Sequence, residues 1–134
     1  MQLIESLMRL ISRFRYPVSL PEDIAHDLGM HLPNHLSFED FLKLLSSPHH
    51  HPTKLHKYML RKAAEETFTL ALKKENFRSS SLFSYYFNNS WLVITLYFDE
   101  EDRLRRVYLQ CPDSEIADGF DLVLQEDKEY LSTP

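Results

Sequence analysis

The chain has 134 residues, including one cysteine and two glycines, and a formal net charge of −5 at pH 7. A chain of this length is expected to form a single domain around one hydrophobic core, and one cysteine excludes an internal disulfide bond. Two glycines also exclude the glycine-rich loops that hold phosphates in the usual nucleotide-binding motifs.

The first sixteen residues have apolar side chains at helical spacing, with Glu5, Arg9 and Arg13 on the other faces. This pattern predicts an amphipathic helix that ends near Pro17 and packs on its own domain, or alternatively forms a homodimer or partner face. Because charges interrupt the apolar residues, we expect neither a secretory signal nor a membrane span. We therefore predict a cytoplasmic protein without membrane contact.

Two short helices should follow. Ser19 can cap the first, with Glu22 three residues later, and Gly29 is a natural C-terminal stop. Ser37 can cap the second, which is expected to span residues 38–46.

The longest helix is expected to run from Thr53 to about Asn76, with Thr53 as its N-cap. From Ser81 the apolar period changes from 3.6 to 2, which is typical of strands. The expected strands are residues 82–87, 91–98 and 103–109, with a short edge strand at 120–124.

The predicted fold class is α+β, because the helices precede the strands. About four N-terminal helices, the fourth of them long, should pack on a C-terminal antiparallel meander of three strands, or four if the edge strand pairs. We expect one domain over residues 1–124 and an acidic, frayed tail over 125–134.

The charge is distributed unevenly along the chain. Residues 43–78 hold eight basic and three acidic residues, a net charge of +5, whereas residues 113–134 have a net charge of −6. The basic segment begins near the expected helix N-terminus, where the helix dipole favours anions. Arg103 and Arg105 should share one face of the sheet, with Arg106 on the other. The candidate binding residues are Lys54, His56, Lys57, Arg61, Lys62, Arg103 and Arg105.

These arginines have a simpler interpretation. They follow the acidic turn Asp99–Asp102, and surface ion pairs of this kind are common and individually weak.

Four of the seven histidines lie between positions 49 and 56, in the stretch SPHHHPTKLHK. A zinc site needs three or four converging ligands, and a polar connector between two prolines is the favoured interpretation. We therefore predict no metal site and no cofactor; if a metal binds, the ligands should be His49, His51 and His56.

No catalytic motif and no family resemblance is present. The composition favours a non-enzymatic protein-interaction module, such as an adaptor, an inhibitor or a chaperone for one partner, and another protein is the expected partner. A nucleic-acid-binding or regulatory protein that uses the basic 43–78 region is the alternative, although a chain of pI about 5.8 disfavours it. A histidine-based, metal-dependent enzyme is the second alternative.

Overall fold

The structure is a computed structural model that describes residues 4, 7, 16–33, 35–87, 90–112 and 119–126. The first predicted helix, apart from Ile4, Leu7 and Tyr16, therefore lies outside the described residues, as do residues 127–134 of the predicted tail. The proposed homodimer face on that helix lies outside them as well.

Three helices occur in the described part of the chain: α2 (Pro21–Leu28), α3 (Phe38–Leu45) and α4 (Arg61–Glu66). The prediction of four N-terminal helices, the fourth of them long, is wrong. The segment expected to form the long helix contains only the six-residue α4, with β1 before it and β2 after it.

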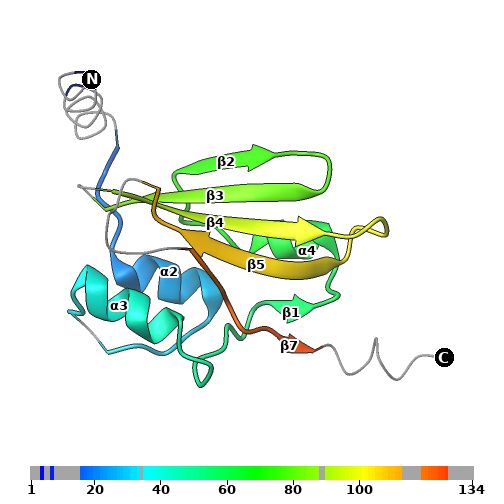
Figure 1. Cartoon of the computed structure of the whole chain (residues 1–134), viewed down its shortest axis with the longest axis horizontal. Helices are drawn as coiled ribbons and strands as arrows, with labels where there is room; N and C mark the ends of the chain where they lie inside the picture. Colours follow the sequence, from blue (N-terminus) through cyan, green and yellow to red (C-terminus); the bar gives the residue numbers. More distant parts are fainter. Residues whose placement is uncertain are drawn as a thin grey trace.

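Five strands of the described chain form one antiparallel sheet in the order β2-β3-β4-β5-β6; Figure 1 labels β2 to β5 of this sheet. The predicted meander of three or four strands is also wrong, because β2 adds an edge strand inside the segment expected to be helical. A separate parallel pair joins β1 to β7. The strands are β1 (His56–Lys57), β2 (Lys73–Asn76), β3 (Ser80–Tyr86), β4 (Trp91–Phe98), β5 (Leu104–Gln110), β6 (Phe120–Asp121) and β7 (Gln125–Glu126).

One face of the sheet forms the core together with the helices. In β4 the inward residues Leu92, Ile94, Leu96 and Phe98 are at most 6% exposed, and they belong to the same buried cluster as residues of α2 and α3. In Figure 1, α2 and α3 lie at one end of the sheet, and α4 lies behind it. The β4 bounds were predicted correctly, since this strand is apolar on both faces.

The predicted end of α2 and start of α3 are confirmed. Gly29 ends α2 with a left-handed φ of 71°, a conformation that glycine adopts without strain. At α3 the Ser37 hydroxyl oxygen accepts a hydrogen bond from the Asp40 backbone N–H at 3.2 Å. Both signals are local in sequence, so they could be recognised before the fold was known.

The predicted start of α2 is wrong. Leu20 is the N-cap residue, and its N–H donates to the Asp23 carboxylate at 2.9 Å. Ser19 instead binds β3: its N–H donates to the Tyr86 carbonyl at 2.6 Å, and its hydroxyl oxygen accepts from the Tyr86 N–H at 3.3 Å. Ser19 therefore attaches the segment before α2 to the sheet.

A buried carboxylate joins α2 to the sheet. Asp27 is fully buried, and its oxygens accept from the Tyr85 hydroxyl at 2.6 Å, the Leu70 N–H at 2.9 Å and the Thr69 hydroxyl at 2.9 Å. His26 Nδ1 lies 3.3 Å from the same carboxylate. A buried ionised group is tolerated only when it is hydrogen-bonded in this way.

The segment predicted to start the long helix packs against the end of α2 instead. The Thr53 hydroxyl donates to the Gly29 carbonyl at 2.5 Å, and the Lys54 ammonium donates to the His26 carbonyl at 3.0 Å. The His26 carbonyl also accepts from the Gly29 N–H at 3.2 Å, and both carbonyls lie at the C-terminus of α2, where a cation is favourable. Thr53 is therefore not an N-cap, and Lys54 lies at the negative end of a helix rather than at a positive one.

Residues 56–60 then run beside the start of β5. Tyr58 has a φ of 74°, its N–H donates to the Leu104 carbonyl at 2.6 Å, and the Leu104 N–H donates to the Met59 carbonyl at 2.8 Å. A backbone that pairs with a strand cannot also form a helix, so α4 begins only at Arg61.

The outer face of the sheet carries aromatic side chains at both ends. At one end Tyr86 is 2% exposed but lies outside the main core cluster. The ring of Trp91 lies 4.9 Å from that of Tyr16 and 5.0 Å from that of Tyr86, and the Lys73 ammonium lies 4.4 Å from the Trp91 ring. At the other end the rings of Tyr97 and Tyr108 lie beside Arg106.

No helix in the described part of the chain combines the length and the apolar character that crossing a bilayer requires.

Candidate functional site

A β-bulge in β5 turns two consecutive arginines towards the same side of the sheet. Tyr97 of β4 pairs with Arg106, and the next residue, Phe98, pairs with Leu104, so Arg105 is one extra residue in β5. In a bulge, two residues of one strand oppose one residue of its neighbour, which interrupts the alternation of side chains. Both arginine side chains are about half exposed, at 49% and 52%, and both line one pocket. The prediction that Arg105 and Arg106 lie on opposite faces is wrong.

Lys57 reaches the same pocket from a distant part of the sequence. The hydrogen bonds of Tyr58 and Met59 to Leu104 hold residues 56–60 along β5, and β1 pairs in parallel with β7. The Lys57 ammonium lies 5.4 Å from the centre of the Tyr58 ring, and the Arg105 guanidinium lies 4.8 Å from the same centre. One tyrosine ring therefore supports two cations from different strands.

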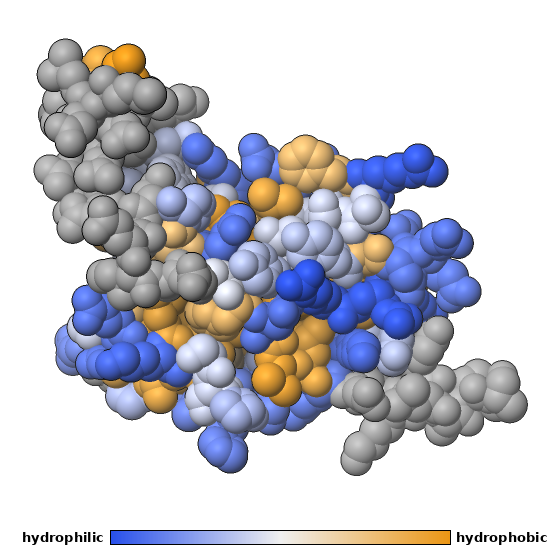
Figure 2. Space-filling view, viewed as in Figure 1, coloured by the Kyte–Doolittle hydropathy of each residue, from blue (hydrophilic) through white to orange (hydrophobic). Residues whose placement is uncertain are grey.

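The pocket lies where β1, β5 and β6 meet and has a volume of about 360 Å³. Figure 2 shows a band of strongly hydrophilic surface over β5 with an apolar patch beside it. Three cations and one carboxylate share the lining with two leucines. The lining residues are Lys57, Arg105, Arg106, Asp121, Leu122 and Leu124.

The Arg106 guanidinium is held from several sides. Its Nε and Nη2 groups donate to the two carboxylate oxygens of Asp121, the Nη2 bond being 3.2 Å long. The rings of Tyr97 and Tyr108 lie 5.4 and 5.1 Å from it, a favourable arrangement for a cation. The hydrogen bond to Asp121 raises the pKa of Arg106 above its ordinary value. Arg106 therefore carries a permanent charge in a defined orientation.

Arg105 is paired more loosely. Its Nη1 group lies 3.5 Å from the Asp99 carboxylate, whose other oxygen accepts from the N–H groups of Glu101 and Arg103 at 3.0 Å. The predicted ion pairing between the acidic turn and the arginines thus occurs at Arg105. Each guanidinium has five N–H groups, so both arginines retain donors for a ligand.

Of the predicted binding residues, Lys57 and Arg105 come together and the others do not. Lys54 binds α2, and the His56 N–H donates to Met59 Sδ at 3.3 Å. Lys62 is exposed on α4, and the Arg103 guanidinium donates to the Tyr58 carbonyl at 3.1 Å. The basic 43–78 segment therefore does not form one continuous patch.

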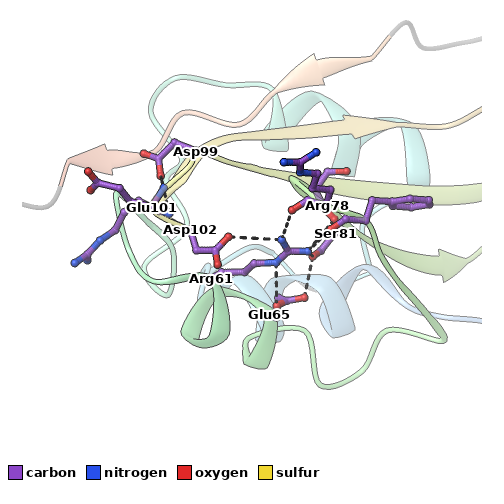
Figure 3. A network of polar contacts seen from close by, with 10 residues as sticks. Arg61, Glu65, Arg78, Ser81, Asp99, Glu101 and Asp102 are labelled. Carbon is purple, nitrogen blue, oxygen red and sulfur yellow. Dashed lines mark hydrogen bonds and ion pairs between the residues drawn. The ribbon is translucent and has the colours of Figure 1, made fainter.

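Arg61, another predicted binding residue, bonds within the fold (Figure 3). Its guanidinium donates to the carbonyls of Phe77, Arg78 and Ser80 at 2.6 to 3.2 Å and to the Ser81 hydroxyl at 3.1 Å. Arg61 also forms ion pairs with Glu65 at 3.4 Å and Asp102 at 3.7 Å, and its side chain is only 16% exposed. Arg61 thus fastens α4 to the β2–β3 turn.

The histidine-rich stretch does not gather metal ligands. No group of three His, Cys, Asp or Glu side chains in the described ranges could hold a metal ion. The His49 N–H donates to the Ser47 hydroxyl, His51 Nδ1 lies 3.4 Å from the Val123 carbonyl, and His56 belongs to β1. His50 Nδ1 is buried and has no hydrogen-bond partner among the described residues.

The predicted site omitted Arg106, Asp121, Leu122 and Leu124. Leu122 lies beside β5 because its N–H donates to the Val107 carbonyl at 2.9 Å. The sequence signal for this pairing was weak, since β6 has only two residues. The sequence shows that Arg105 and Arg106 are consecutive, but strict alternation placed them on opposite faces of the sheet.

Comparison with known proteins gives no relative. No family model, no curated protein and no solved structure matches this chain. The function must therefore be inferred from the geometry of the pocket and the surface around it.

Proposed function

We propose that the chain is a non-enzymatic protein-interaction module that binds a partner protein at the cationic pocket and the tyrosines beside it. The observation that supports this function is the bulge at Arg105, which places two arginines side by side next to Lys57. Arginine and tyrosine are enriched at protein interfaces, where they contribute much of the binding energy.

The chemistry of the pocket suits binding better than proton transfer. Guanidinium groups stay protonated at all physiological pH values, and the Asp121 carboxylate is already bound to Arg106. A general acid or base needs a pKa near the working pH. The pocket therefore offers fixed positive charge for recognising an anionic group.

The alternatives remain predictions with less support. Nucleic-acid binding has less support because Lys54 and Arg61 of the basic segment donate hydrogen bonds to backbone carbonyls of the chain itself. For a metal-dependent enzyme, the three candidate histidines are held by separate contacts. We also propose a cytoplasmic location. The one cysteine, Cys111, is buried, and proteins in a reducing compartment usually have no disulfide bonds.

Photocrosslinking in the source cell tests the interaction. Benzoylphenylalanine at Tyr97, which is 38% exposed beside Arg106, should give one discrete crosslinked protein. The matched control carries the same group at Phe77, which is 55% exposed near β2, at the opposite edge of the sheet. If the Tyr97 position yields no adduct above the Phe77 background, the proposal is wrong. An adduct of twice the chain mass identifies a second copy as the partner.

A further inference from the structure

We infer that the pocket anchors one carboxylate side chain of an acidic segment in the partner, with an aliphatic neighbour of that carboxylate lying against Leu122 and Leu124. This inference rests on the proposed function and specifies the chemistry of the partner. It follows from the charge balance, the free hydrogen-bond donors and the apolar side of the pocket.

The charge balance favours an anionic ligand. Lys57, Arg105 and Arg106 against Asp121 give the lining a net charge of +2. Beside the lining, Asp99 pairs with Arg105, and the Arg103 guanidinium donates to the Tyr58 carbonyl, so these two neighbours add no net charge. One carboxylate is therefore fully compensated by the charge of the pocket.

The donors are oriented before the ligand arrives. Asp121 occupies Nε and Nη2 of Arg106, and Asp99 approaches Nη1 of Arg105. The remaining N–H groups of two neighbouring guanidiniums can each donate to one oxygen of a carboxylate. Tyrosine rings restrain both side chains, so little conformational entropy is lost on binding.

The leucines favour a peptide over a free anion. A volume of about 360 Å³ is at the lower end of the range of ligand sites, roughly 300 to 1,000 Å³, and is far larger than one carboxylate. Leu122 and Leu124 line the remaining part. Leu122 is only 4% exposed, so the half-buried Leu124 offers most of the surface for an aliphatic side chain. An acidic residue next to Leu, Ile or Val fits both parts of the pocket.

Peptide display tests this specificity on the full chain. Random peptides of about a dozen residues are selected on the immobilised protein, and the dissociation constants of the enriched peptides are measured. We expect the enriched sequences to share an Asp or Glu beside an aliphatic residue. Replacing that acid with its amide should weaken binding at least about tenfold, the loss expected for a hydrogen bond to a charged group.

Substitutions in the protein show whether the peptide binds at the pocket. Arg106→Met should weaken binding about tenfold or more, whereas Lys74→Met, the same charge change on the exposed strand β2, should change it less than about twofold. Trp91 fluorescence verifies that each variant is folded, and the peptide substitution does not depend on protein stability at all.

Several results would overturn the inference. They are no enriched peptide family, enrichment without an acid, an amide that binds equally well, and equal effects of the two protein variants. Tighter binding of the peptide with phosphoserine in place of the acid, or displacement of the peptide by single-stranded RNA, would also overturn it. If the Tyr97 crosslink forms but the acid-to-amide change in the peptide does not weaken binding, this inference is wrong and the proposed function stands. If the crosslink does not form, both the inference and the proposed function are wrong.

Discussion

The buried Asp27 should be the most sensitive polar position in the described core. Asp27→Ala removes the acceptor of the Tyr85 hydroxyl, the Leu70 N–H and the Thr69 hydroxyl. Tyr85 is itself fully buried, so its hydroxyl cannot turn to water. An unsatisfied buried donor costs about 1–3 kcal/mol, so leaving the Tyr85 hydroxyl and the Leu70 N–H without an acceptor gives an expected loss of about 2–6 kcal/mol.

Asp27→Asn should be much milder. The amide oxygen can replace the carboxylate oxygen that accepts from Tyr85 and Leu70. The amide nitrogen then faces the Thr69 hydroxyl, which can accept a hydrogen bond as well as donate one. The bonds lose their ionic strengthening, but the cost of burying a charge disappears too, so we expect a loss of about 1–2 kcal/mol.

Urea denaturation, followed by circular dichroism and by Trp91 fluorescence, measures these losses if the two probes give coincident transitions. Glu66→Ala, at an exposed position on α4, serves as control and should stay within about 0.5 kcal/mol. The double variant with Tyr85→Phe should lose about 1–2 kcal/mol less than the sum of the single losses, because the unsatisfied hydroxyl is gone. Equal losses for the alanine and asparagine variants, or additivity in the double variant, would refute this reasoning.

Three further predictions concern single contacts. Burial and the Asp27 carboxylate raise the pKa of Tyr85, so the folded chain keeps a proton that the unfolded chain loses above about pH 10. The stability advantage over Tyr85→Phe should then shrink by up to about 1.4 kcal/mol per pH unit, measured by urea denaturation from about pH 9 to 11; a constant advantage would contradict this. Arg61→Met should cost about 2–4 kcal/mol in the same assay, because several carbonyls lose a charged donor, whereas Lys62→Met should cost less than about 0.5 kcal/mol; similar values for the two would contradict the role of Arg61. Gly29→Ala should cost about 1–3 kcal/mol by thermal unfolding, because φ is 71° and the new Cβ would lie 2.2 Å from the Thr53 hydroxyl oxygen; an unchanged melting temperature would contradict it.

Local signals predicted part of the fold from the sequence. The Ser37 cap, the Gly29 stop and the bounds of β4 depend on neighbouring residues alone, and the structure confirms them. The predicted long helix does not form, because pairing with distant strands overrides the local helical pattern. Arg61–Glu66 has strong helix formers and is helical, whereas Lys73–Asn76 is polar throughout and becomes a strand only by pairing with β3.

The candidate site was predictable only in its residue types. Lys57 and Arg105 were among the predicted residues, but their proximity depends on the pairing of residues 56–60 with β5. The partnership of Arg106 with Asp121 depends on the register of β6 against β5. Asp27 gave a weak signal, three residues after Ile24 and one before Leu28, on the apolar side of α2. Nothing local to Asp27 identified Tyr85 as its partner.

The cations on the two sides of the sheet differ in what they do for the fold. Arg61 is 16% exposed and bonded to several groups of its own chain, so its contacts account for its presence. Arg105 and Arg106 are about half exposed, and ion pairs at such positions contribute only about 0–1 kcal/mol. A regular strand would pair with β4 more completely than the bulged one does. Because stability does not require two arginines brought together by a bulge, their convergence beside Lys57 supports a role in recognition.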